Sequence, residues 1–166
     1  LLGHVASVAA AQTVVLPMIF LSALLLVFGW QALRLFAFPV LFLYFAMPAV
    51  EHLQFVFQEI TIVAVHAMIN LVDIAAWVEG KHVMIPAGTF AIESGCSGLN
   101  FAVSGVSLAA LYAFLYYDNW RAAAKLMLLV LAVSMVGNWL RVFIIVNVGY
   151  FYGMNVSLVA DHLWLG

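Results

Sequence analysis

Long apolar segments, separated by short polar ones, dominate the chain. A helix needs about 20 apolar residues to cross the hydrocarbon core of a membrane. Residues 35–50 are apolar but short, and residues 1–12 are interpreted as the end of an earlier helix. Clear spanning helices are predicted at residues 13–32, 99–117 and 122–148.

Residues 51–74 have a different pattern, with polar side chains at helical spacings of three and four. We expect a non-spanning amphipathic helix at the membrane interface, although such a stripe is also compatible with a wet groove between helices. The polar members are Glu51, Gln54, Gln58, Glu59, His66, Asn70 and Asp73.

Residues 80–95 break the helical pattern. Two short runs, 82–85 and 89–92, flank Pro86, Ala87 and Gly88, which is typical of a β-hairpin. Unpaired backbone is not tolerated in lipid, so this hairpin is expected outside the hydrocarbon core or buried in protein.

Composition agrees with the pattern. Hydrophobic residues make up 68% of the 166 and charged residues 7%, against roughly 25% charged in soluble domains, and mean hydropathy is +1.20. Membrane lipid is therefore the expected solvent. The net charge of −2 gives no indication of nucleic-acid binding. One cysteine excludes an internal disulfide within the chain.

We therefore expect an all-α polytopic membrane protein. It would be a helical bundle with an amphipathic interfacial helix and a small extracytoplasmic β-hairpin before the cysteine. Residues 1–166 are interpreted as a single domain, and as a piece of a longer protein that lacks N-terminal helices and the C-terminal end.

The few cations predict the orientation in the membrane. Arg121 and Lys125 lie in and just after a short loop between two spans, and Arg34 lies in another short loop. The positive-inside rule places both loops in the cytoplasm, so residues 50–98 are expected on the outer side.

Cys96 precedes the span that begins at Leu99. A helix N-terminus stabilises an anion, which predicts a lowered thiol pKa and a reactive nucleophile. The alternative is a buried cysteine that acts as a small hydrophobe.

Arg141 lies inside an apolar span, where a charged side chain is a candidate for function unless it snorkels to the interface. Cys96 precedes Tyr117 by 21 residues, and Arg141 follows Arg121 by 20. At about 1.5 Å per residue, both lie about 30 Å from the same loop. An antiparallel hairpin would bring a nucleophile level with a group able to stabilise an oxyanion.

A general base is harder to choose. Geometry leaves several histidines open, and each taken alone is more often structural. We find no HExxH motif or Cys/His cluster, so neither a metal nor another cofactor is expected. The histidines are His4, His52, His66, His82 and His162.

Three motifs together resemble the exosortase family of bacterial membrane enzymes, related to the archaeosortases, and most closely its exosortase A subgroup. They are residues 93–100 (ESGCSGLN), 137–141 (GNWLR) and 161–163 (DHL). Residues 38–43 and 111–113 also fit, and the likeness extends from about Leu16 to the end. The family usually has about eight spans, whereas about four are visible in this chain.

The resemblance implies a cysteine protease or transpeptidase in the bacterial inner membrane, with its active site on the periplasmic side. Its partners would be exported proteins whose C-terminal sorting tail has a Pro-Glu-Pro motif, a hydrophobic span and a basic end. The family's proposed triad falls on Cys96 as nucleophile, His162 as base and Arg141 as oxyanion stabiliser.

Three neighbouring residues are candidates for supporting roles. Asn138 shares a helix face with Arg141 and would hold it, Ser97 would cap the helix that follows, and Glu93 would either orient the loop or simply face solvent. The competing hypothesis is a non-enzymatic membrane transporter or scaffold in which the polar stripe lines a path.

Overall fold

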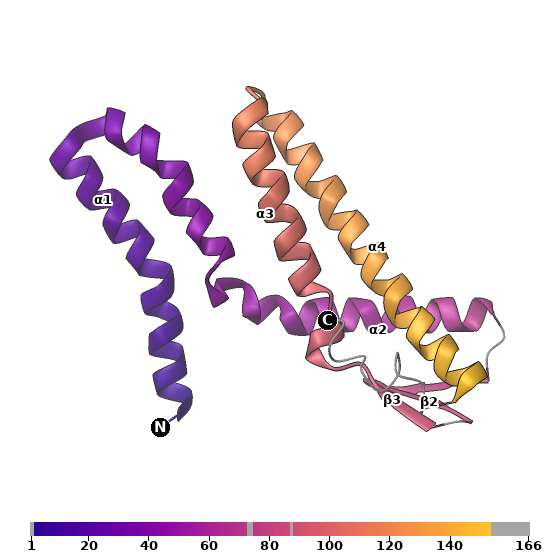
Figure 1. Ribbon diagram of the computed structural model, residues 1–166. Helices are drawn as coiled ribbons and strands as arrows, with labels where there is room; N and C mark the ends of the chain where they lie inside the picture. Colours follow the sequence, from indigo (N-terminus) through magenta and orange to yellow (C-terminus); the bar gives the residue numbers. More distant parts are fainter. Residues whose placement is uncertain (1, 73–74, 87, 154–166) are drawn as a thin grey trace.

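The computed structural model describes residues 2–72, 75–86 and 88–153. Long helices stand roughly parallel, one helix lies across their lower end, and a small sheet lies below it (Figure 1). The elements in order are α1 (Leu2–Phe42), the 3-10 turns η1 (Leu43–Phe45) and η2 (Pro48–Leu53), α2 (Gln54–Leu71), β1 (Trp77–Glu79), β2 (His82–Ile85), β3 (Gly88–Ala91), the 3-10 turn η3 (Ser94–Cys96), α3 (Leu99–Tyr116) and α4 (Trp120–Tyr152).

α1 is two helical arms joined at Gly29. That residue has φ +76° and ψ −171°, a conformation that side chains with a Cβ rarely adopt, and the chain turns back there (Figure 1). The predicted span 13–32 was therefore wrong at both ends, because residues 2–12 continue into the first arm and the break comes at Gly29. A lone glycine in an apolar run gave no sign of the reversal.

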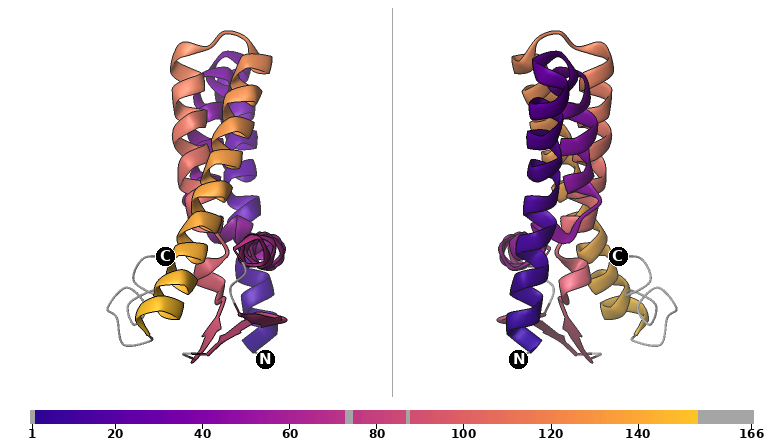
Figure 2. Two further views of the ribbon diagram at one scale, coloured as in Figure 1. Left: turned by 90° about the vertical axis from the view of Figure 1, so that its right-hand side faces the viewer. Right: turned by 90° about the vertical axis from the view of Figure 1, so that its left-hand side faces the viewer.

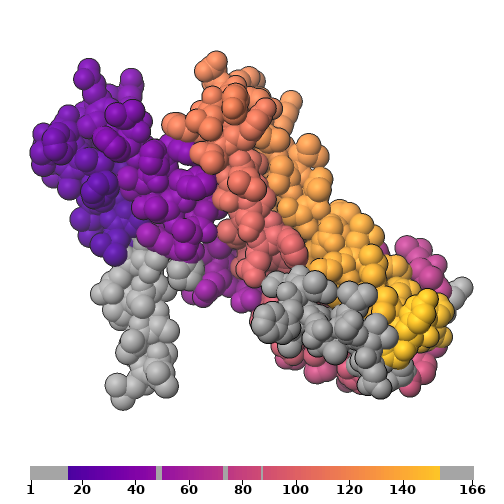
Figure 3. Space-filling view, in the orientation of Figure 1, coloured from indigo at the N-terminus to yellow at the C-terminus, as the bar shows by residue number. Residues whose placement is uncertain are grey.

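The outer surface of α1 is apolar. Leu26 is 86% exposed and Val27 is 72% exposed, which is tolerable in lipid but costly in water. By length and composition, four segments of the described residues could cross a membrane: Val15–Phe45, which includes the reversal at Gly29, Val50–Leu71, Leu99–Tyr116 and Trp120–Tyr152. Together these features describe a multi-pass membrane protein. The space-filling view shows residues 15–42 of α1 along one edge of the molecule (Figure 3).

α3 and α4 form the predicted antiparallel hairpin. Asn119 caps α4 by accepting a hydrogen bond from the Arg121 N–H at 2.9 Å. The helices pack closely at Gly105, where an added Cβ would lie 2.7 Å from the Ser134 hydroxyl. The second arm of α1 contacts this hairpin, since Phe38 of α1 stacks on Phe114 of α3 with ring centroids 3.8 Å apart.

α4 is longer than a membrane requires. Its 33 residues extend about 50 Å, against a hydrocarbon core of about 30 Å. Beyond Arg141, its last turns pack on the sheet and on α2 in one apolar cluster, and Gly149 lies against the ring of Phe90. Cys96 belongs to this cluster, with Val65, Ile69, Val83, Ile85, Phe90, Ile92, Val142, Ile145 and Val146.

α2 lies across the long helices rather than along them, and it is seen end-on when they are seen from the side (Figure 2). This orientation agrees with the expected interfacial helix, even though its length and apolarity alone would allow a span. Thr61, Val65 and Ile69 form its buried face.

The predicted hairpin is part of a three-stranded antiparallel sheet in the order β1-β2-β3. β2 has the predicted bounds, whereas β3 begins one residue earlier than predicted and ends at Ala91. The prediction missed β1, in which Trp77 pairs with Met84 and Glu79 with His82. Three residues are too short a run for a periodic signal, so only pairing with β2 defines this strand.

Candidate active site at the Cys96 turn

Cys96 ends the turn η3, which connects the sheet to α3. Its side chain is 4% exposed, and its N–H donates to the Glu93 carbonyl at 2.9 Å. The residue thus lies outside the spanning segment Leu99–Tyr116, at the end of the hairpin opposite the α3–α4 connection (Figure 1).

Every backbone carbonyl of residues 92–97 accepts a hydrogen bond. The Glu93 carbonyl binds the Cys96 N–H within the turn. The other five receive side-chain donors from α2 or α4. These bonds are Gln58 Nε2 to Ile92 O (2.6 Å), Gln54 Nε2 to Ser94 O (3.1 Å), Arg141 Nη2 to Gly95 O (3.4 Å), Asn138 Nδ2 to Cys96 O (2.9 Å) and Thr61 Oγ1 to Ser97 O (3.1 Å).

Asn138 connects the Cys96 carbonyl with Thr61 and Arg141, and it is 2% exposed. Its Nδ2 also lies 3.4 Å from the Thr61 hydroxyl, and its Oδ1 accepts from Arg141 Nη2 at 3.2 Å. Gly98 packs directly on it with φ +84°, and an added Cβ would lie 2.8 Å from the Asn138 amide carbon. The contact with Arg141 is the one expected from their spacing, whereas the contact with the Cys96 carbonyl comes from the tertiary fold.

Arg141 reaches the turn from α4, so the hairpin brings the predicted nucleophile segment and the predicted arginine together. Besides its bonds to Gly95 and Asn138, its guanidinium carbon lies 5.1 Å from the centroid of the Phe101 ring. This cation–π contact and the two hydrogen bonds direct the positive charge towards the first turn of α3.

Burial raises the pKa of the Cys96 thiol above its ordinary value, although the Arg141 cation and a backbone hydrogen bond at Glu93 partly oppose that rise. The predicted lowering of this pKa was wrong. Cys96 precedes α3 by three positions and lies in an apolar cluster, so desolvation outweighs the field of the helix terminus. A thiol in this state needs a base to become a nucleophile.

The other predicted residues have mixed outcomes. Ser97 Oγ accepts from the Leu99 N–H at 3.3 Å, which supports the start of α3, although Gly98 occupies the N-cap position itself. Glu93 is partly exposed and faces Lys81, with 3.9 Å between their charged atoms. His162 lies outside the described residues.

Sequence reasoning missed Thr61, and it assigned no contact to Gln54 and Gln58. Gln54, Gln58 and Thr61 are spaced by four and three residues, so they share one face of α2. The regular spacing was visible, but the identity of the segment that this face meets was not.

A hollow of about 560 Å³ borders the start of α3. Leu99 and Asn100, three and four residues after Cys96, form one wall with Ser104, and Glu51 belongs to the opposite wall. Its lining combines the polar side chains of Glu51, Asn100 and Ser104 with apolar ones, which suits the boundary between water and lipid.

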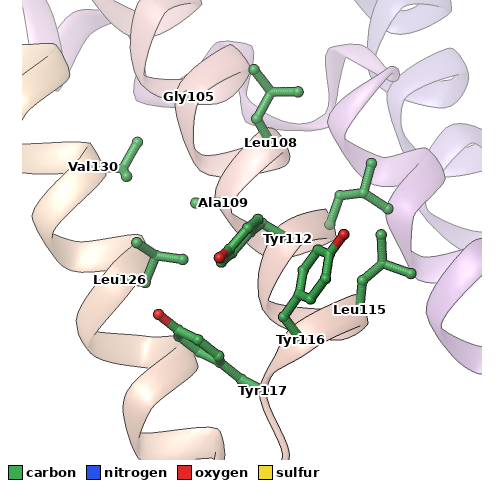
Figure 4. Close-up of a pocket in the computed structure, with 10 residues that line it drawn as sticks. Gly105, Leu108, Ala109, Tyr112, Leu115, Tyr116, Tyr117, Leu126 and Val130 are labelled. Carbon is green, nitrogen blue, oxygen red and sulfur yellow. The ribbon is translucent and has the colours of Figure 1, made fainter.

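An open groove of about 810 Å³ lies at the other end of the α3–α4 hairpin (Figure 4). Tyr112, Tyr116 and Tyr117 line it together with aliphatic side chains. Tyrosine is enriched at membrane interfaces, so these rings and the nearby Arg121 mark that end as an interfacial level remote from Cys96.

The chain is similar to one known protein family over its full length. No curated protein and no solved structure matched it. The sequence profile of the family described as transmembrane exosortase matches residues 1–166, the full length. The chain therefore belongs to the transmembrane exosortase family, and its apolar helices agree with that membership.

Proposed function

We propose that this protein is a membrane cysteine protease or transpeptidase that removes C-terminal sorting tails from exported proteins. The observation that carries the proposal is the contact of Arg141 with the Cys96 turn, in a chain of this family. The tails would have a Pro-Glu-Pro motif, a hydrophobic span and a basic end.

In the proposed reaction, the sulfur of Cys96 forms a bond to the scissile carbonyl carbon. Because the pKa of Cys96 is raised, the thiol needs a base, and His162 takes its proton. His162 returns that proton to the leaving amine when the carbon–nitrogen bond breaks. Arg141 stabilises the tetrahedral oxyanion and stays protonated throughout. Water or an acceptor amine then releases the acyl group from sulfur.

The proposed site faces the periplasm of a bacterial inner membrane. Arg121 and Lys125 lie at the end of the α3–α4 hairpin away from Cys96, and Arg34 follows the Gly29 turn at that same end (Figure 1). The positive-inside rule assigns this end to the cytoplasm. The hollow beside Leu99 would receive the tail where its polar segment meets its hydrophobic span.

The alternative of a transporter or scaffold has less support. A transport path needs polar groups in the middle of the membrane. Gln54 and Gln58 instead bind the Cys96 turn, and the helix that holds them lies across the end of the bundle.

The test is co-expression of the full-length protein with a reporter that ends in a sorting tail, with tail loss measured by gel shift. Cys96→Ala and Arg141→Ala are expected to abolish processing. Ser107→Ala is a matched control because, within the part of the chain that the structure describes, its hydroxyl bonds only to Ser104 O in the same helix, at 2.8 Å. Processing at the wild-type rate by Cys96→Ala would refute the proposed function.

A further inference from the structure

We propose that Gln58 and Thr61 of α2, assisted by Gln54, are positioning residues that hold the Cys96 turn in its reactive orientation. The inference rests on the proposed function, since it gives α2 a part in the reaction assigned to Cys96. It extends the site from the hairpin to the interfacial helix.

α2 is a fixed support for the Cys96 turn. Val65 and Ile69 are each 0% exposed, within the cluster formed with the sheet and the end of α4. Thr61 continues the same buried face one turn earlier. Donors on this face therefore have little freedom to move relative to the turn.

The three hydrogen bonds from α2 reach both sides of Cys96. Gln54 binds Ser94 O, Gln58 binds Ile92 O and Thr61 binds Ser97 O, so the donors of one helix face hold carbonyls before and after Cys96. Asn138 supplies the bond to Cys96 O itself and lies 3.4 Å from the Thr61 hydroxyl. The two helices thus restrain the turn from two directions.

The Ser94 carbonyl does not depend on Gln54 for a hydrogen-bond partner. It also accepts from the Ser97 N–H at 3.1 Å, and Ser94 is exposed to water. A hydrogen bond that replaces water adds little net stability but does fix direction. The bond therefore contributes mainly to geometry, and a nucleophile is sensitive to geometry because displacements of about 1 Å can cost about 100-fold in rate.

The test measures kcat and KM for tail removal by the full-length protein in membranes, with Gln58→Met and Thr61→Val. Loss of positioning is expected to lower kcat about tenfold while KM stays within about twofold, because neither side chain is placed on the substrate. Thr61→Ser keeps the hydroxyl and is expected to restore kcat to within about threefold. Gln31→Met in α1 is the matched glutamine control.

Two further measurements separate the possible outcomes. Alkylation of Cys96 by a bulky maleimide is expected to become several-fold faster in Gln58→Met, because the buried thiol is released. Gln54 is half-buried at the first residue of α2 and is not part of the apolar cluster. Gln54→Met leaves that cluster intact, so a fall in its kcat is not expected to come from unfolding.

Wild-type kcat in Gln54→Met, Gln58→Met and Thr61→Val would overturn the inference, and so would a rise in KM alone. Processing that survives in Cys96→Ala would instead overturn the proposed function on which the inference rests. The inference is supported when Cys96→Ala abolishes processing and the α2 variants lower kcat.

Discussion

Replacing Asn138 gives the sharpest test of how the turn is held. Asn138→Ala removes the donor to the buried Cys96 carbonyl and the acceptor for Arg141. A buried polar group left without its partner costs about 1–3 kcal/mol. Arg141 is only half-buried and can bind water instead, so we assign the cost to the Cys96 carbonyl alone.

If the lost hydrogen bond raises the activation free energy of tail removal by this full amount, the processing rate falls about 5-fold to 150-fold. Asn138→Asp has the same shape, but its carboxylate cannot donate and places a negative charge beside the Cys96 carbonyl. Its rate is therefore expected to fall at least as far as that of Asn138→Ala. The assay is the rate of tail removal at matched protein levels in the membrane.

Asn147 provides the control. It lies on the same helix, but its Nδ2 donates to Phe143 O at 2.7 Å, within α4. Asn147→Ala is expected to change the rate by less than about threefold. Equal rates for Asn138→Ala and Asn147→Ala would refute the reasoning, because the Cys96 carbonyl would then not depend on its donor.

Two other substitutions test the same region. Gly98→Ala is expected to destabilise the fold by about 2–4 kcal/mol, because φ +84° strains a residue with a Cβ and that Cβ meets Asn138. Thermal unfolding in detergent measures this loss of stability. Gly137→Ala is the control, because Gly137 has open space around it and the change should be neutral. Equal unfolding temperatures for Gly98→Ala and Gly137→Ala would count against the close contact. Arg141→Gln removes the cation that lowers the pKa of Cys96, so that pKa should rise further and thiol alkylation at pH 8 should slow. The pH profile of iodoacetamide labelling measures this, and a profile unchanged or moved to lower pH would contradict the electrostatic role.

The sequence by itself determined the solvent, the main helices and the placement of Cys96 and Arg141 at one end of the hairpin. Apolar runs of sufficient length define α3 and α4 to within a few residues, since lipid requires such runs. Equal distances along the chain from one short loop then predict that Cys96 and Arg141 meet at one end, because a helix has a constant rise. That prediction is confirmed by the bond from Arg141 to the Cys96 turn.

Only the tertiary structure decided how the turn is held and what state its thiol has. Helical periodicity puts Gln54, Gln58 and Thr61 on one face, but it does not identify the segment that this face meets. Likewise, the sign of the pKa change at Cys96 depends on desolvation by side chains from α2, the sheet and α4. Periodicity is a property of one element, whereas burial and hydrogen-bond partners are properties of several elements packed together.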